Sequence, residues 1–334
     1  MNKTYRYFAA GLLLLLGTSQ LRAETQLLNV SYDVARELYG QIDPAFAAYW
    51  KNKTGESLTV KESFGGSSKQ ARAVVEGLEA DVVTLNQVSD VELLHKQGGL
   101  IGADWQKQFP YNSSPYYSVI GFVVRKGNPK GIKNWDDLVK PGVQVIFPNP
   151  KTSGNGRYTY LAAWAYAGKK FNGDQAKVQD FINKLVANVP VFDTGGRGAT
   201  TTFVERQIGD VLITFEAETL GIQKQYGKDK FDVFVPGLTI AAEFPVAVVD
   251  KYAAAHKTAR QAKAFIEYLY SPEAQDILAR NFYRVRDNNV AAKYASQFPN
   301  AETVTAEQLG GWEKIGKTHF SDGGTFDQAV SLKR

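Results

Sequence analysis

The sequence contains no cysteine among its 334 residues. This absence excludes disulfides, thiolate nucleophiles, cysteine-bound zinc and iron–sulfur clusters. Histidine is almost as scarce, because the sequence has only His95, His256 and His319, and they lack the spacing of metal ligands. We therefore expect neither a metal nor any other cofactor.

Long apolar runs are also missing, apart from one near the N-terminus. Residues 8–16 are apolar, but the run is too short to cross a bilayer, which needs about 20 such residues. It follows the basic residues Lys3 and Arg6 and precedes a segment that ends on the small residue Ala23. This layout predicts a secretory signal peptide over residues 1–23, and hence a periplasmic protein.

A strong excess of one charge is absent from the rest of the chain. The 39 basic and 34 acidic side chains give a formal net charge of +5. Residues 1–23 hold three of the basic and none of the acidic side chains, so their removal would leave 311 residues with a net charge of +2. A nearly neutral protein lacks the basic excess that displaces counterions from nucleic acid. We expect no nucleic-acid partner.

Short apolar runs of strand type alternate with segments whose apolar residues recur at helical spacing. The expected strands cover residues 26–30, 58–60, 81–85, 119–124, 144–147, 210–215 and 244–249. The expected helices cover residues 34–50, 67–78, 158–167, 176–187 and 262–270. This alternation predicts an α/β fold with mostly parallel sheets and a ligand at the carboxyl ends of the strands.

Four of the strand-to-helix junctions are rich in small and hydroxyl residues. They cover residues 31–33, 64–70, 148–157 and 192–199. The first amides of a helix have no intrahelical partner, and the N-terminus carries about half a positive charge. Several such ends aimed at one point can bind an anion without lysine or arginine. Helix capping alone would also explain each junction taken singly.

Longer blocks of sequence carry a family resemblance. They cover residues 29–38, 66–71, 80–88, 123–130, 147–155, 193–203 and 323–327. Through these blocks the chain resembles the periplasmic sulfate- and thiosulfate-binding proteins, and the thiosulfate-binding branch more closely. The resemblance implies an α/β, two-lobed periplasmic-binding-protein fold of type II, with the ligand in the cleft between the lobes.

The resemblance also implies a set of ligand-binding residues but no catalytic ones. That set is Asp33, Ser67, Ser68, Ser153, Gly154, Asn155, Gly196 and Phe215. The sulfate-binding branch has glycine in place of Asn155, and a tryptophan whose indole donates a hydrogen bond in place of Phe215. Because the terminal sulfur of thiosulfate accepts hydrogen bonds poorly, an apolar ring suits it, and we expect thiosulfate binding as well as sulfate binding.

The implied lobes divide these residues between them. Lobe 1 is expected at residues 24–114 and 246–300, lobe 2 at 115–245, and residues 301–334 are expected to return across the hinge. Closure would then assemble donors from both lobes around the anion. The resemblance further implies a monomer that delivers sulfate or thiosulfate to an ABC transporter permease in the inner membrane.

Selectivity for a fully deprotonated anion predicts a site that offers hydrogen-bond donors only. We therefore expect the Asp33 carboxylate to cap its own helix, while Glu216 and Glu218 either lie near the site or form salt bridges. Arg125, Arg157 and Arg197 lie near the junctions, and we expect them to act outside the direct contact with the anion.

Two other functional classes stay open from the sequence. An exported hydrolase of sulfate or phosphate esters is the first alternative, although the junctions show neither a nucleophile with a base nor a metal site. A structural or adhesive protein is the second, although the sequence has no repeat. Residues 311–318 match the P-loop pattern, but no strand is expected before them, and we interpret the match as chance.

Overall fold

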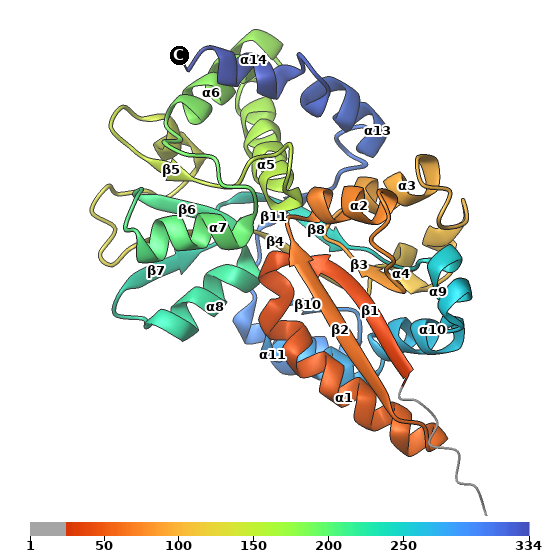
Figure 1. The fold of residues 1–334 in the computed structure, drawn as a ribbon. Helices are drawn as coiled ribbons and strands as arrows, with labels where there is room; N and C mark the ends of the chain where they lie inside the picture. The colour runs from red at the N-terminus through yellow and green to blue at the C-terminus, as the bar shows by residue number, and fades with distance from the viewer. Residues whose placement is uncertain (1–24, 334) are drawn as a thin grey trace, which may run out of the picture.

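The computed structural model describes residues 25–333 and consists of two sheets, each flanked by helices (Figure 1). The expected signal peptide, residues 1–23, lies outside the described residues. Within residues 25–333 no helix is long and apolar enough to cross a membrane. The two sheets form the cores of two lobes that lie side by side.

The first sheet has the order β2-β1-β3-β9, and its first three strands are parallel. Its strands are β1 (Thr25–Tyr32), β2 (Leu58–Gly65), β3 (Val82–Thr84) and β9 (Val246–Val248). The helices of this part of the chain are α1 (Arg36–Thr54), α2 (Ser67–Val75), α3 (Val88–Lys96), α4 (Pro110–Ser113), α9 (Asp250–His256), α10 (Ala259–Tyr268), α11 (Pro272–Arg280) and α12 (Asn288–Tyr294), with the short 3-10 helices η1 (Asp33–Ala35), η2 (Trp105–Lys107) and η5 (Ala295–Gln297).

The second sheet has the order β11-β8-β4-β6-β5, with β7 and β10 also paired to β4. Its strands are β4 (Tyr116–Arg125), β5 (Val145–Ile146), β6 (Val211–Phe215), β7 (Phe231–Phe234), β8 (Leu238–Phe244), β10 (Arg284–Val285) and β11 (Glu302–Val304). The helices are α5 (Gly154–Lys170), α6 (Gln175–Ala187), α7 (Gly196–Thr200), α8 (Glu216–Tyr226), α13 (Gly311–Ile315) and α14 (Thr325–Ser331), with the short helices η3 (Trp135–Val139), η4 (Thr201–Glu205) and η6 (Gly316–Phe320).

The expectation of mostly parallel sheets is wrong for the second sheet. Its long strand β4 runs antiparallel to β6, β7, β8 and β10, and only the β5–β6 and β8–β11 pairs are parallel. The chain passes between the sheets three times, because β9 of the first sheet lies between β8 and β10 of the second sheet along the sequence. It first enters the second sheet at Tyr116 and leaves it at Phe244, two residues before β9 begins, and these two residues lie opposite each other, so β4 and β8 run antiparallel.

Aromatic side chains fill the region where the chain passes between the sheets. The ring of Phe244 lies 5.2 Å from Tyr32, 5.3 Å from Tyr116 and 5.0 Å from Phe215, measured between centroids. The hydroxyl of Tyr32 also donates to that of Tyr283 at 3.2 Å. Such ring pairs contribute roughly 0.5–1.5 kcal/mol each beyond the burial of their area. This cluster joins the ends of β1, β4, β6 and β8.

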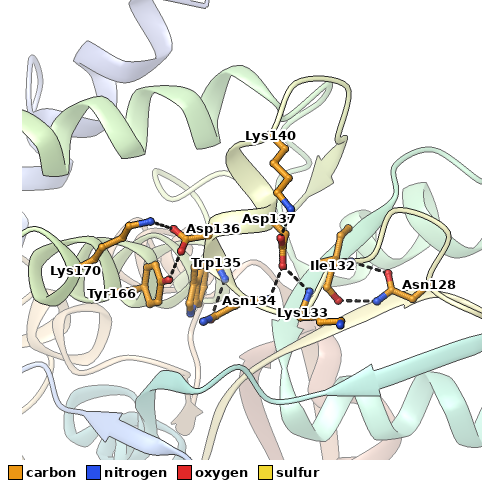
Figure 2. A network of polar contacts seen from close by, with 10 residues as sticks. All are labelled: Asn128, Ile132, Lys133, Asn134, Trp135, Asp136, Asp137, Lys140, Tyr166 and Lys170. Atoms are coloured by element: carbon orange, nitrogen blue, oxygen red, sulfur yellow. Dashed lines mark hydrogen bonds and ion pairs between the residues drawn. The ribbon is translucent and has the colours of Figure 1, made fainter.

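The 3-10 helix η3 anchors α5, whose N-terminus faces the first lobe (Figures 1 and 2). The side chain of Asn134 accepts from the Trp135 amide at 2.9 Å, and that of Asp137 accepts from the Asn134 amide at 3.0 Å, forming a capping box. Burial alone would raise the pKa of Asp137, but the Lys140 side chain and the backbone amides of Lys133 and Asn134 bring it below its ordinary value. Asp136 then accepts from the Tyr166 hydroxyl on α5 at 2.7 Å.

Two half-buried carboxyl groups face each other between α1 and β2. Burial raises the pKa of Asp43 to about 7. Burial also raises the pKa of Glu62 to about 10, and the neighbouring charge of Asp43 adds to this rise. The amide of Asn29 donates to one Glu62 oxygen at 2.9 Å. Glu62 therefore keeps its proton at neutral pH.

This pair predicts a loss of stability at alkaline pH. Because both pKa values are higher in the folded than in the unfolded protein, the stabilisation is complete below the ordinary carboxyl pKa and disappears as pH rises through about 7 towards 10. Glu62→Gln keeps an acceptor for Asn29 and removes one ionisation, so it should flatten the fall in Tm between pH 6 and 9.5. Thermal unfolding checks this, with the exposed Glu76→Gln as control, and an unchanged slope in Glu62→Gln would contradict it.

Candidate functional site

The four junctions singled out in the sequence meet between the two lobes, at the N-termini of α2, α5 and α7 (Figure 1). A β-carbon on Gly66, just before α2, would lie 2.6 Å from the Thr152 carbonyl oxygen and 2.7 Å from that of Thr194. A β-carbon on Gly195, just before α7, would lie 2.2 Å from a carboxylate oxygen of Asp33. Backbone from three of the junctions and the Asp33 side chain from the fourth are thus in direct contact, because Gly66 and Gly195 have no side chain.

Ser67 and Ser68 open α2 and are both buried. The Ser67 hydroxyl oxygen accepts from the backbone amide of Asn86 at 3.3 Å. The Ser68 hydroxyl donates to Asp90 at 3.1 Å and accepts from the Gln87 side chain at 3.0 Å. Ser68 is therefore engaged within its own lobe, whereas the backbone of Ser67 stands at the helix end.

Ser153, Gly154 and Asn155 form the start of α5. Ser153 occupies the N-cap position, but its hydroxyl makes no capping bond to the helix. A β-carbon on Gly154 would lie only 1.9 Å from the side-chain oxygen of Asn86 in the other lobe. The Asn155 side chain donates to the Thr214 hydroxyl on β6 at 2.7 Å.

Gly196 is the first residue of α7 and lies at the meeting point of several elements. A β-carbon there would be 2.9 Å from the Val34 side chain, 3.2 Å from the side-chain nitrogen of Asn155 and 3.5 Å from a carboxylate oxygen of Glu218. Any larger residue would displace one of these neighbours. The structure therefore brings Gly196 together with the starts of η1 and α5.

The Asp33 carboxylate caps two helices rather than its own alone. It accepts from the Val34 amide at 3.0 Å, as expected for its own helix, and from the Arg197 amide of α7 at 3.1 Å. Burial raises the pKa of Asp33, and these two amides partly offset the rise. The Arg197 amide in the first turn of α7 therefore already has a hydrogen-bond partner within the protein.

Glu218, for which the sequence left open a place near the site, does lie there, half-buried on α8. Its carboxylate accepts from the hydroxyls of Thr200 and Thr214, the latter at 2.9 Å. Burial raises the pKa of Glu218 to about 7, and the charge of Asp33 adds to the rise. A carboxylate therefore lies near Gly196, although its oxygens accept from hydroxyls of the protein, and the expectation of a site with donors only stays a prediction.

Glu216, by contrast, forms a salt bridge. Both of its carboxylate oxygens accept from the Arg284 guanidinium, at 2.7 and 3.0 Å. Phe215, just before it, packs its buried ring against Phe244 and, at 6.1 Å between centroids, against Tyr158. Its contacts therefore belong to the aromatic cluster between the sheets, and its role beside a ligand stays a prediction.

The three arginines near the junctions all contact other parts of the protein. Arg125 stacks on Phe203, with its guanidinium carbon 3.8 Å from the ring centroid. Arg157 on α5 lies 3.7 Å from Asp90 in the first lobe, and Arg197 on α7 pairs with Glu37 on α1. The last two pairs join the two lobes, so these guanidinium groups hold the lobes together around the site.

Comparison with known proteins now places this geometry in a family. The sequence matches the profile of the bacterial extracellular solute-binding proteins over residues 33–284. The chain belongs to this family. This solute-binding protein is 54% identical over 312 residues to the thiosulfate-binding protein of Escherichia coli K12, covering 93% of this chain and 92% of the relative. It is also 54% identical over 317 residues to the sulfate-binding protein of Salmonella typhimurium LT2, covering 95% and 96%.

A solved structure supports the same assignment. The sulfate-binding protein SubI from Mycobacterium tuberculosis H37Rv superposes with a TM-score of 0.80 at 34% identity, covering 88% of this chain and 99% of SubI. The family resemblance and the two-lobed fold expected from the sequence are confirmed. These relatives are binding proteins, as expected, and nothing in the comparisons supports an ester hydrolase.

The described residues of the solute-binding protein contain neither a P-loop nor a cluster of metal ligands. The P-loop-like residues 311–318 lie in α13 and η6, and the nearest preceding strand, β11, ends at Val304. No strand therefore leads into a phosphate loop there, and the interpretation as a chance match is confirmed. Among residues 25–333, no three or more histidine and acidic side chains are grouped to hold a metal.

The close approach at Gly154 predicts a strong effect of a single methyl group. Gly154→Ala would force α5 away from Asn86, and we expect it to lower the free energy of unfolding by about 1–3 kcal/mol. Gly168→Ala is the matched control, because it lies in the same helix with nothing within 4 Å and should raise stability by up to ~1 kcal/mol. Urea denaturation measures both, and equal effects would contradict the predicted contact.

Proposed function

We propose that this protein binds sulfate and thiosulfate in the cleft between its lobes and delivers them to the permease of an ABC importer. The observation that carries the proposal is the convergence of four strand-to-helix junctions, from both lobes, on one point. Helix N-termini offer donors and a positive potential to an anion. The names of the sulfate- and thiosulfate-binding relatives support these two anions as ligands.

The proposed donors are mostly backbone amides. They are the amides of Asp33, Ser67, Gly154, Asn155 and Gly196, together with the hydroxyl of Ser153. A hydrogen bond to an anionic oxygen contributes roughly 1.5–3 kcal/mol, so five or six are sufficient for micromolar affinity after the cost of association. No lysine or arginine is required in the direct contact.

Closure connects this binding to transport. In the proposed arrangement, lobe 1 (residues 24–114 and 246–300) supplies Asp33 and Ser67, and lobe 2 (residues 115–245) supplies the other donors. The anion then stabilises the closed state, since only that state assembles all donors, and the permease recognises the closed surface. We propose that this cycle takes place in the periplasm, with a monomer from which residues 1–23 have been removed.

Titration calorimetry with sulfate, thiosulfate and phosphate tests the proposed function directly. We expect sulfate and thiosulfate to bind with micromolar or lower Kd and to raise Tm, because both anions stabilise the closed state. Phosphate should bind much more weakly, because it carries a proton near pH 7. A protein that binds neither sulfate nor thiosulfate would contradict the proposal, and turnover of a sulfate ester would favour the hydrolase instead.

Ser153→Ala should remove one donor at the start of α5. The loss of one charge-assisted bond corresponds to roughly 1.5–3 kcal/mol, or about a 10- to 150-fold higher Kd for sulfate. The matched control is Ser271→Ala, which removes the cap that accepts from the Ala274 amide at 3.2 Å on α11. That variant should lose about 1 kcal/mol of stability with an unchanged Kd. An unchanged Kd in Ser153→Ala would remove Ser153 from the site.

A further inference from the structure

Two buried amide side chains lie beside the proposed anion site but are not among the proposed donors. Asn86 and Gln87 lie between β3 and α3 and are 2% and 0% exposed. The side-chain carbonyl oxygens of both have no hydrogen-bond partner among the described residues. Leaving a buried acceptor unpaired costs roughly 1–3 kcal/mol, so two neighbouring cases call for a functional reason.

Asn86 lies between helix ends that belong to different lobes. Its backbone amide donates to the hydroxyl oxygen of Ser67 at the start of α2. Its side-chain oxygen lies 1.9 Å from where a β-carbon of Gly154 would be, at the start of α5. Asn86 therefore contacts both proposed donor residues, Ser67 through its backbone amide and Gly154 through its side chain.

The Gln87 side chain also lies next to Gly154. Its side-chain carbon lies 3.3 Å from the same β-carbon position of Gly154. Its amide nitrogen donates to Ser68, and Ser68 in turn donates to Asp90, which is 3.7 Å from Arg157 of α5. This chain of polar contacts fixes the orientation of Gln87 and crosses from one lobe to the other.

We propose that Asn86 is a further ligand-contact residue that donates from its side-chain amide to the bound anion, and that Gln87 is its positioning residue. The inference rests on the proposed function. A half-turn about the last torsion of asparagine exchanges its amino and carbonyl groups, and this torsion is broad. With the amino group turned towards Gly154, Asn86 donates to an anion that also accepts from the first amides of α5.

The lack of charge on the Asn86 side chain also affects which oxyanions the site can accept. An amide can donate to a fully deprotonated oxyanion, whereas a carboxylate at the same place would repel that anion and accept from one that carries a proton. Asn86 therefore accommodates the fully deprotonated sulfate and thiosulfate anions, which an acidic residue at this place would repel. Because the side chain reaches Gly154 from the opposite lobe, it makes this contact only when the lobes are closed.

Calorimetry on Asn86→Ala and Asn86→Asp, in the chain without residues 1–23, tests the inference. At pH 8 we expect Kd for sulfate and thiosulfate to rise about 10- to 150-fold in Asn86→Ala, and further in Asn86→Asp because its charge faces the anion. The ratio of the phosphate Kd to the sulfate Kd at pH 6 should fall at least tenfold in Asn86→Asp. The control Asn289→Asp, exposed on α12, should change neither quantity.

Gln87→Ala separates a positioning role from a purely structural one. It should weaken binding in the wild-type background but have no further effect on Kd when added to Asn86→Ala, since it acts through Asn86. Wild-type protein that binds neither anion would overturn the proposed function and this inference with it. This inference alone would be overturned if the wild-type protein binds sulfate or thiosulfate but both Asn86 variants have Kd values within twofold of the wild-type value. The ratio of the phosphate Kd to the sulfate Kd would then also be unchanged.

Discussion

The unpaired amides at helix N-termini are the constraint on which the rest of the structure depends. They must be satisfied by something, and here the starts of η1, α2, α5 and α7 meet instead of ending at separate places on the surface. Such close convergence requires positions without a side chain. Gly66 and Gly195 are such positions, because a β-carbon on Gly66 would overlap two backbone carbonyl oxygens and one on Gly195 would overlap a carboxylate oxygen of Asp33.

The sheets place those helix ends and also allow them to separate. In the first sheet, parallel strands deliver η1 and α2 at their carboxyl ends. The second sheet is tied to the first by β4 and the β8–β9 passage, around the rings of Tyr116 and Phe244. Only a few segments connect the lobes, and most of the site is contact across the gap. The ion pairs Arg157–Asp90 and Arg197–Glu37 form across the same gap, so in the proposed cycle they add to the stability of the closed state.

The sequence allowed the junctions to be predicted, because glycine and hydroxyl residues before a helical pattern are local signals. The helix expected from residue 158 begins at Gly154. Its first turn was not predicted because it consists of small and polar residues and lacks the apolar spacing used to recognise helices. The direction of β4 was not predictable, because antiparallel pairing depends on where the chain crosses between lobes. Asn86 was missed, and the place of Glu218 was left open, for a related reason: only contacts between residues distant in sequence, of Glu218 with Thr200 and of Asn86 with Gly154, bring them to the site.

The charges around the site explain why neutral dipoles are left for recognition. Arg157 and Arg197 are paired with carboxylates of the other lobe, while Asp33 and Glu218 accept from amides and hydroxyls of the protein. A guanidinium in direct contact would attract any anion with little regard to its protonation. Backbone amides only donate, so they distinguish an oxygen that only accepts from one that carries a proton. In the proposed function, discrimination among tetrahedral oxyanions therefore depends on the geometry of uncharged donors, and closure of the lobes completes that geometry.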